Sequence, residues 1–275
     1  MFSKSNRLVG FGGVLLLSIV LVSVFANTLT SYSPIETKAE IRLTPPNKQH
    51  IFGTDQMGRD MFSRVLNGGK ATLFASLTAM FTTLLIGVVL GIISGYYQKS
   101  VLDMVLLRII DALMGFPFMI LAMIIAAFFG TGFIHLLIAI IIVRWIPFAR
   151  LARSITMLAA EGVEIQAAIV TGASDLRIMF KHIFPKVIIP AMVLATFELG
   201  NLILSIAALS FFGLGSKPPT PEWGSILADS KPYFFQSPYL VIMPSIFIFF
   251  TVFALNIVGE GLRDKYETSE VYDIW

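Results

Sequence analysis

Long apolar runs separated by short polar stretches dominate the chain and predict a bundle of membrane-spanning helices. The first two runs lie at 8–29 and 71–97. The third run ends near 129, the fourth ends near 148, and the last two lie at 187–212 and 238–258. A helix needs roughly 20 apolar residues to cross the hydrocarbon core, where its backbone must be hydrogen-bonded internally. The pattern predicts an all-α polytopic membrane protein with six transmembrane helices.

The first run is expected to remain in the mature protein as an anchor. Lys4 and Arg7 precede it, as basic residues precede a signal peptide. Its apolar core exceeds the roughly 7–15 residues of such peptides, and no clean small-x-small cleavage site follows.

Glycine and proline mark two features of the next spans. Gly87, Gly91 and Gly95 recur every four residues, so they share a helix face that another helix can approach closely in lipid. Charged residues between 99 and 111 suggest a turn before the third run. Pro117 lies inside that run and is expected to kink or unwind the helix.

A polar stretch from Glu164 to Pro185 separates the fourth and fifth runs, and its charges keep it out of the hydrocarbon. We expect two short helices bent at Gly172, because glycine adopts turn conformations that other residues resist. Ser174 and Asp175 suit the N-terminus of the second helix, and Pro185 would end it. Ala167 and Ala168 give the first helix a small face that can be approached closely. Lys181 and His182 suit the C-terminus of the second helix. The stretch is either a projection shaped for a partner's socket or a plain helix-turn-helix without a partner.

Polar residues inside the fifth run are candidates for a solute path. Glu198 and Asn201 are three residues apart and Ser205 follows one turn later, so all three lie on roughly one helix face. An intramembrane carboxylate suggests function by default. A buried hydrogen bond to a neighbouring helix is an equally weighted alternative for Glu198.

Composition and missing motifs exclude several classes of protein. Only 13% of the 275 residues are charged and 56% are hydrophobic, whereas a soluble domain carries about 25% charged residues. The net charge of +3 does not suggest nucleic acid, and the lack of cysteine excludes disulfides and thiolate metal sites. The sequence has no P-loop, HExxH or GxSxG motif, which argues against ATP binding and against an enzyme. His50, His135 and His182 are too separated to share a metal ion.

Basic residues set the expected topology. The N-terminus, the turn at 98–108, the loop at 144–186 and the C-terminal tail carry lysine and arginine, which places them in the cytoplasm. The segment at 30–70 would lie outside although it is also basic, with its charge partly balanced by acidic residues. Both termini are therefore expected to be cytoplasmic.

Four motifs, in order, resemble the permeases of bacterial dipeptide, oligopeptide and nickel ABC importers. The segment at 52–70 is similar to the GTDxxGRDxxSR signature of that family, and 208–224 and 256–264 are similar to its LSFLGLG…PPxPxWG and NxxGDxLRD motifs. The polar stretch resembles the family's EAA loop, with Gln166 where Glu is usual, followed by Ala167, Ala168, Gly172, His182 and Pro185. The chain looks like the second of the two permease subunits. Residues 55–67 could form a short amphipathic helix in a solvated outer loop, to which we assign no chemistry.

The resemblance implies a type I ABC importer permease fold in the bacterial inner membrane. It implies a first helix and outer loop at 1–69, a permease core at 70–265 with the coupling loop at 161–186, and a cytoplasmic tail at 266–275. Expected partners are a second permease subunit, two ATP-binding subunits that hold ATP and magnesium, and an extracellular solute-binding protein. No cofactor is expected in this chain. The residues expected to couple to the ATPases are Gln166, Ala167, Ala168, Gly172, Ser174, Asp175, His182 and Pro185.

The solute is less constrained. Peptide-importing members often carry an acidic residue where this chain has Ile206, which slightly favours nickel or a metal chelate over short peptides. A passive channel or scaffold is the alternative from another class.

Overall fold

The computed structural model describes residues 2–130 and 132–272, and apart from one isolated antiparallel bridge between Thr54 and Asp60 the secondary structure assigned within these ranges is helical. The helices are α1 (Phe2–Val24), α2 (Ala26–Leu29), η1 (Ala39–Ile41), α3 (Met61–Tyr96), α4 (Val101–Met114), α5 (Phe118–Phe129), α6 (Phe133–Arg144), α7 (Ile146–Ala160), α8 (Val163–Val170), α9 (Asp175–Ile178), η2 (Met179–Ile183), α10 (Phe184–Phe211), α11 (Trp223–Ser230), η3 (Lys231–Tyr233) and α12 (Tyr239–Tyr272). The predicted all-α fold is confirmed.

Within the described ranges, five helical segments are long and apolar enough to cross a membrane. A sixth span results if α4 and α5 count as one, although they meet at 97°. The break at Gly115–Pro117 confirms the kink expected at Pro117. The turn before this span is shorter than predicted, because α4 already begins at Val101 and therefore includes Asp103, Arg108 and Asp111.

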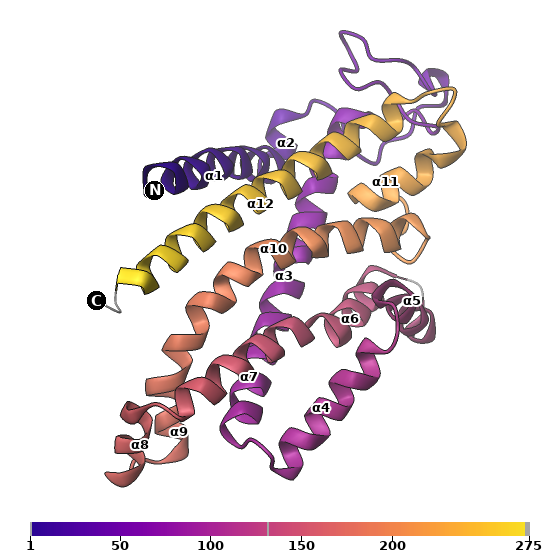
Figure 1. Cartoon of the computed structure of the whole chain (residues 1–275). Helices are drawn as coiled ribbons and strands as arrows, with labels where there is room; N and C mark the ends of the chain where they lie inside the picture. Colours follow the sequence, from indigo (N-terminus) through magenta and orange to yellow (C-terminus); the bar gives the residue numbers. More distant parts are fainter. Residues whose placement is uncertain (1, 131, 273–275) are drawn as a thin grey trace.

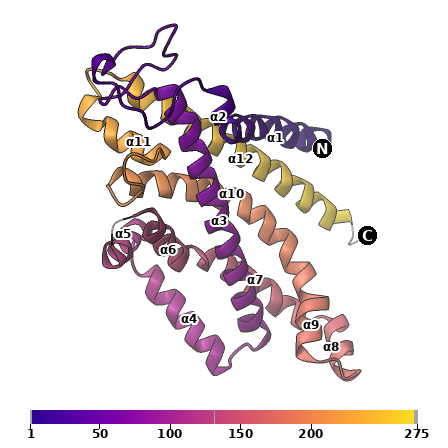
Figure 2. The same ribbon diagram turned by 180° about the vertical axis from the view of Figure 1, so that it is seen from behind.

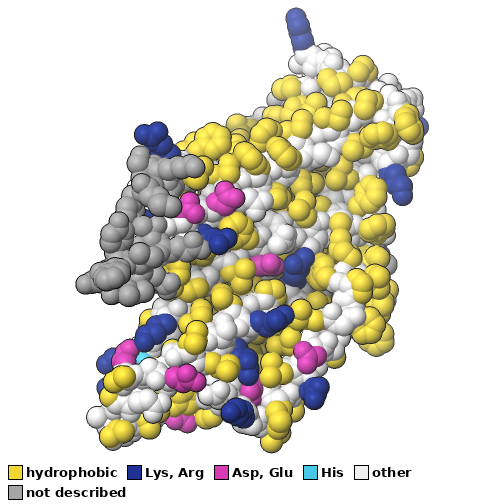
Figure 3. Space-filling view, viewed as in Figure 1, with side chains coloured by type: hydrophobic (Ala, Val, Ile, Leu, Met, Phe, Trp, Pro, Cys, Tyr) yellow, Lys and Arg dark blue, Asp and Glu magenta, His cyan; other side chains and the backbone are white. Residues whose placement is uncertain are grey.

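The long helices lie side by side, with the chain's polar segments gathered at two ends (Figures 1 and 2). α1 and α12 run together along one side, α3 crosses the bundle, and α4 lies at the opposite side. α8 and α9 project at one end, while residues 30–60 and α11 cover the other. Hydrophobic side chains cover most of the visible face, and charged side chains gather toward the end that carries α8 and α9 (Figure 3). This distribution suits a bundle surrounded by lipid.

The glycine face predicted on α3 packs against α7. A Cβ atom on Gly91 would lie 2.4 Å from the carbonyl oxygen of Ala149. On Gly87 and Gly95 it would lie 2.5 Å and 2.7 Å from the carbonyl oxygens of Trp145 and Arg153. Only glycine permits this helix separation, so the packing interpretation of the glycine face is confirmed.

The outer segment at 52–64 is more buried than expected for a solvated loop. Arg59 and Arg64 are each 1% exposed, and Arg59 Nε donates to Asp55 Oδ2 at 2.6 Å. Asp60 caps α3 by accepting from the Ser63 amide, so the helix begins at Met61 and continues directly into the span. The separate amphipathic helix expected at 55–67 is therefore wrong. The first turns of α3 are held by buried charge pairs, which an amphipathic pattern does not encode.

A second buried group joins this segment to α11. Glu222 caps α11 by accepting from the amides of Gly224 and Ser225, and its carboxylate also accepts from the Thr72 hydroxyl on α3. Burial raises the pKa of the Glu222 carboxyl. The Trp223 indole donates to the carbonyl of Val65 at 2.8 Å. The PEWG sequence at 221–224 thus holds the outer loop against α3.

Candidate functional site

The polar stretch between α7 and α10 forms the two short helices that its sequence predicts. α8 ends at Val170 and α9 begins at Asp175, and between them Gly172 has a φ of +80°, which favours glycine. The Ser174 hydroxyl accepts from the Arg177 amide as the N-cap of α9. The bend at Gly172 and the capping role of Ser174 are confirmed.

The end of this stretch differs from the prediction. Residues Met179–Ile183 form a π-helical turn, and Pro185 lies in the first turn of α10, so it does not terminate a helix. Proline is tolerated there because the first amides of a helix need no partner within it. Lys181 and His182 lie inside the π-helical turn, beyond the end of α9, and the loop continues into the fifth span without a break in helical structure.

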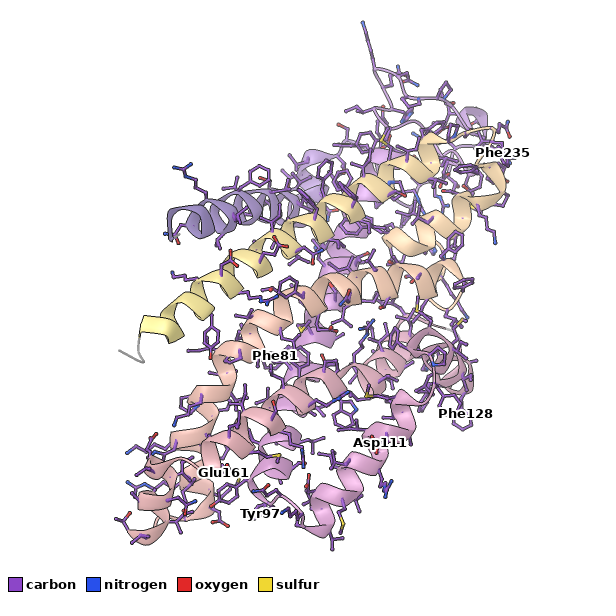
Figure 4. The ribbon with its side chains drawn as sticks, in the orientation of Figure 1. Phe81, Tyr97, Asp111, Phe128, Glu161 and Phe235 are labelled. Atoms are coloured by element: carbon purple, nitrogen blue, oxygen red, sulfur yellow. The ribbon has the colours of Figure 1, made fainter. Side chains whose placement is uncertain are left out.

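Side chains of the bundle hold the loop in place. The hydroxyls of Tyr96 and Tyr97, at the end of α3, donate to the two carboxylate oxygens of Asp175 at 2.9 Å and 2.7 Å. Figure 4 labels Tyr97 at the end of the molecule that carries α8 and α9. The hydrogen bond to Asp175 raises the pKa of the Tyr97 hydroxyl. α9 is thereby tied to α3, a contact that the spacing along the sequence did not suggest.

His182 is tied to the first short helix through Glu164. His182 Nδ1 lies 2.9 Å from Glu164 Oε1, and the Lys186 ammonium donates to Glu164 Oε2 at 2.7 Å. The hydrogen bond with His182, together with that from Lys186, lowers the pKa of the Glu164 carboxyl to about 2. These contacts join α8 to the π-helical turn and to α10, with the Glu164 carboxylate ionised at neutral pH. We call the contacts of Glu164 with His182 and Lys186 the clasp.

The remaining predicted residues lie on the surface of α8. Gln166 Nε2 donates to the carbonyl of Ala160 at 2.8 Å, Ala167 is exposed and Ala168 is half-buried. Large apolar side chains are more prominent on the loop than these alanines: Val163, Val170, Leu176 and Phe180 are 64–87% exposed. Such an apolar projection next to charged residues suits contact with another protein. The sequence analysis did not identify these four residues as contact residues, because each is a single apolar residue in a polar stretch.

Glu198, Asn201 and Ser205 lie together on α10, as predicted, and they meet an arginine that the sequence had placed elsewhere. Arg144 was assigned to the cytoplasmic loop at 144–186, but the span runs from Phe133 to Ala160 and contains it. Its guanidinium donates to Glu198 Oε2 at 3.2 Å and to the Ser205 hydroxyl at 3.0 Å. Asn201 Nδ2 donates to Glu198 Oε1 at 3.2 Å. We call Arg144, Glu198, Asn201 and Ser205 the intramembrane cluster.

The broken helix contributes an aromatic ring to the intramembrane cluster. The guanidinium carbon of Arg144 lies 4.0 Å from the centre of the Phe118 ring, at the start of α5. Phe118 also packs on the apolar core between α5 and α6. The bend at Pro117 therefore places an aromatic face where it stabilises a cation inside the membrane.

Comparison with known proteins gives the family. The model of the family described as "Binding-protein-dependent transport system inner membrane component" matches residues 87–268. This chain belongs to that family. It is a multi-pass protein of the bacterial inner membrane and a permease subunit of an ABC importer, and a separate ATPase subunit and a substrate-binding protein work with it.

Relatives of known name match nearly the whole chain. A dipeptide transport system permease protein of Alkalihalophilus pseudofirmus is 40% identical, over 96% of this chain and 86% of the relative. A glutathione transport system permease protein of Pectobacterium atrosepticum is 36% identical over 93% and 85%. A di/tripeptide permease protein of Pseudomonas aeruginosa is 35% identical over 93% and 86%.

A solved structure supports the fold. A chain of the methionine ABC transporter MetNI, in a study of inward-facing conformations, matches with a TM-score of 0.56. The match covers 74% of this chain and 97% of the other, at 18% identity, and so shows the fold alone. The predicted importer-permease fold is confirmed.

Proposed function

We propose that this chain forms one half of the membrane path of a peptide importer, paired with a second permease subunit and driven by two ATPase subunits. The observation that carries the peptide assignment is the similarity, at 35–40% identity over more than nine-tenths of the chain, to permeases named for dipeptides, di/tripeptides and glutathione. The preference for nickel drawn from Ile206 finds no support in these relatives. Within the described residues, no group of three or more potential ligands could hold a metal ion.

The proposed orientation places both termini and the loop of α8 and α9 in the cytoplasm. The loop would then meet an ATPase subunit through Val163, Val170, Leu176 and Phe180, with Gln166, Ala167, Ala168, Gly172, Ser174, Asp175, His182 and Pro185 shaping it. The opposite end would receive the substrate-binding protein, and Phe235 there is 97% exposed (Figure 4). No cofactor is assigned to this chain.

Uptake in cells tests the substrate. Cells that lack this chain and regain it on a plasmid are given labelled alanyl-alanine or labelled nickel. The proposal expects restored uptake of the dipeptide only. Restored uptake of nickel would favour the metal alternative, and uptake that persists when the ATPase subunits are deleted would favour a passive channel.

Cysteine labelling tests the orientation, since the natural chain has no cysteine. Leu176→Cys on the loop and Ile35→Cys on the outer segment introduce single thiols at side chains that are 64% and 49% exposed. A membrane-impermeant maleimide should label Ile35→Cys in spheroplasts and Leu176→Cys in inverted vesicles, with protection of the latter by the ATPase subunits. The reverse pattern would overturn the orientation.

A further inference from the structure

Two arginine–carboxylate pairs inside the described spans, Arg153–Asp103 and Arg144–Glu198, differ in how fully each is bonded. Arg153 on α7 donates Nε and one terminal nitrogen to both oxygens of Asp103, at 2.8 Å and 3.0 Å. Asp103 also accepts from the Ser94 hydroxyl and the Lys99 amide. Both oxygens of Asp103 accept hydrogen bonds, and Arg153 donates to them from two nitrogens in the short, two-pronged geometry of a structural ion pair.

The pair in the intramembrane cluster is loose. Arg144 reaches Glu198 through a single contact of 3.2 Å, whereas charge-assisted hydrogen bonds are usually about 2.7–2.9 Å. Nε of Arg144 is buried and has no hydrogen-bond partner among the described residues. The second oxygen of Glu198 receives only the 3.2 Å contact from Asn201. Both charged groups therefore retain bonding capacity that the chain itself does not use.

The pair also lies where a solute could reach it. The side chains of Arg144 and Glu198 are 20% and 12% exposed, and Asn201 is exposed, so the pair lies at the surface of this chain. Charged groups facing lipid are costly, which places this surface toward the interior of the assembled transporter. A cavity of about 230 Å³, lined by residues that include Met114, Phe118 and Arg144, adjoins the guanidinium. That volume exceeds the roughly 30 Å³ that one water molecule takes up in the liquid.

We propose that Arg144 and Glu198 bind the two charged ends of a peptide during its passage. The peptide's carboxylate takes the place of Glu198 at the guanidinium, and its ammonium takes the place of Arg144 at the carboxylate. This inference rests on the proposed function and adds the class of substrate that the path accepts: a peptide with both ends free, which is zwitterionic at neutral pH.

Charge balance selects a zwitterion over a simple ion. An anion bound to Arg144 would leave Glu198 without a partner inside the membrane, and a cation bound to Glu198 would leave Arg144 without one. Each outcome is unfavourable, because it leaves a desolvated charge without a partner. A zwitterion satisfies both groups at once, and the ion pair closes again after it leaves. The ends of an extended dipeptide lie about 7 Å apart, within reach of two long side chains that change rotamer.

Removing both charges separates this role from a structural one. Arg144→Gln, Glu198→Gln and the double variant are assembled with both ATPases, the second permease subunit and the binding protein in proteoliposomes. Arg150→Gln is the matched control, because Arg150 is an exposed arginine on α7 outside the intramembrane cluster. Melting temperature and uptake of labelled alanyl-alanine per ATP hydrolysed are measured for each.

Each single variant is expected to melt below the wild type, because it leaves one charge unpaired. The double variant is expected to recover most of that loss and yet import the dipeptide at least tenfold more slowly per ATP, while Arg150→Gln imports it normally. Recovery of both stability and uptake in the double variant would overturn the inference. Failure of the wild type to import the dipeptide or glutathione would instead overturn the proposed function.

A second measurement applies if the double variant does not assemble. Arg144→Lys keeps the charge but loses the fork that holds a carboxylate. Uptake of free alanyl-alanine and of its C-terminal amide is compared, each divided by the amount loaded on the binding protein. The ratio of free to amidated peptide is expected to fall at least threefold in Arg144→Lys, and an unchanged ratio would overturn the inference.

Discussion

Alanine at position 91 is expected to push α3 away from α7. Its Cβ atom would lie 2.4 Å from the carbonyl oxygen of Ala149 and 2.7 Å from Cβ of Ala152. The first distance must widen to at least 3.4 Å, the lower limit of an ordinary contact. The obstacle is backbone, which no rotamer change can move, so the whole helix has to shift.

The size of the effect follows from two opposing terms. Overpacking a core costs about 1–3 kcal/mol, and a backbone obstacle belongs at the upper end. Alanine regains about 1 kcal/mol of helix propensity relative to glycine. The net loss is about 2 kcal/mol, which for a chain of this size lowers the melting temperature by roughly 4–8 °C.

Thermal unfolding of the purified transporter measures this loss, with Gly13→Ala as the matched control. Gly13 lies in the long N-terminal helix α1, and a Cβ atom there would meet no heavy atom within 4 Å. This control should melt at or above the wild-type temperature. If Gly91→Ala melts as high as Gly13→Ala, the glycine face does not set the distance between α3 and α7 and the reasoning fails.

Three further predictions concern the coupling loop and its supports. Gly172→Leu should weaken coupling because a side chain at a φ of +80° costs about 1–2 kcal/mol, whereas Gly172→Asn should retain it, as measured by uptake and by ATPase stimulation with loaded binding protein. Normal values for Gly172→Leu would refute the role of the bend. Arg153→Gln should destabilise the chain by about 3–5 kcal/mol, seen as a lower melting temperature, because it leaves Asp103 buried without its main partner; a wild-type melting temperature would refute that support. The clasp at Glu164 has a lowered pKa, so its contribution is full above pH 4.5 and is lost as pH falls toward 2. The protection factors of the α8 amides, which correct for the intrinsic pH dependence of exchange, should fall over that window in the wild type and stay constant in Glu164→Gln; equal profiles of protection factor against pH would contradict the assignment.

Local patterns in the sequence predicted those features that depend on one residue or on one helix. The four-residue spacing of Gly87, Gly91 and Gly95 fixes a helix face whatever the partner, and Pro117 interrupts a helix by lacking an amide hydrogen. Gly172 likewise marks a bend that few other residues adopt. These expectations needed no knowledge of which helices are neighbours.

Features that depend on distant partners were not predictable in this way. Arg144 was assigned to the cytoplasmic loop at 144–186 because basic residues gather on the cytoplasmic side, but inside the span Glu198, 54 residues away, pairs with it. The polar segment that carries Arg59 and Arg64 was interpreted as a solvated outer loop, although carboxylates including Asp55 neutralise both arginines in the folded chain. Pro185 was expected to end a helix, since the sequence does not show the π-helical turn that precedes it. In each case a rule for an isolated residue gave way to a contact made only in the fold.

The loop of α8 and α9 and the intramembrane cluster are connected by one continuous helical segment. Helical structure continues from Asp175 through the π-helical turn and α10 to Phe211, and it forms one of the spanning segments. Glu198 lies on this helical segment, 23 residues after Asp175, which corresponds to about 35 Å along the helix at 1.5 Å per residue. The span that carries Arg144 enters the loop through α7, and the span that carries Glu198 leaves it through α9 and α10. Under the proposed coupling, we expect a displacement of the loop by an ATPase subunit to tilt these two spans relative to each other and so to move Glu198 relative to Arg144. A contact of 3.2 Å at that junction changes steeply with such a shift, whereas the doubly bonded Arg153–Asp103 pair resists it. We therefore expect loop motion to lengthen and shorten the contact between Arg144 and Glu198 at the proposed binding site.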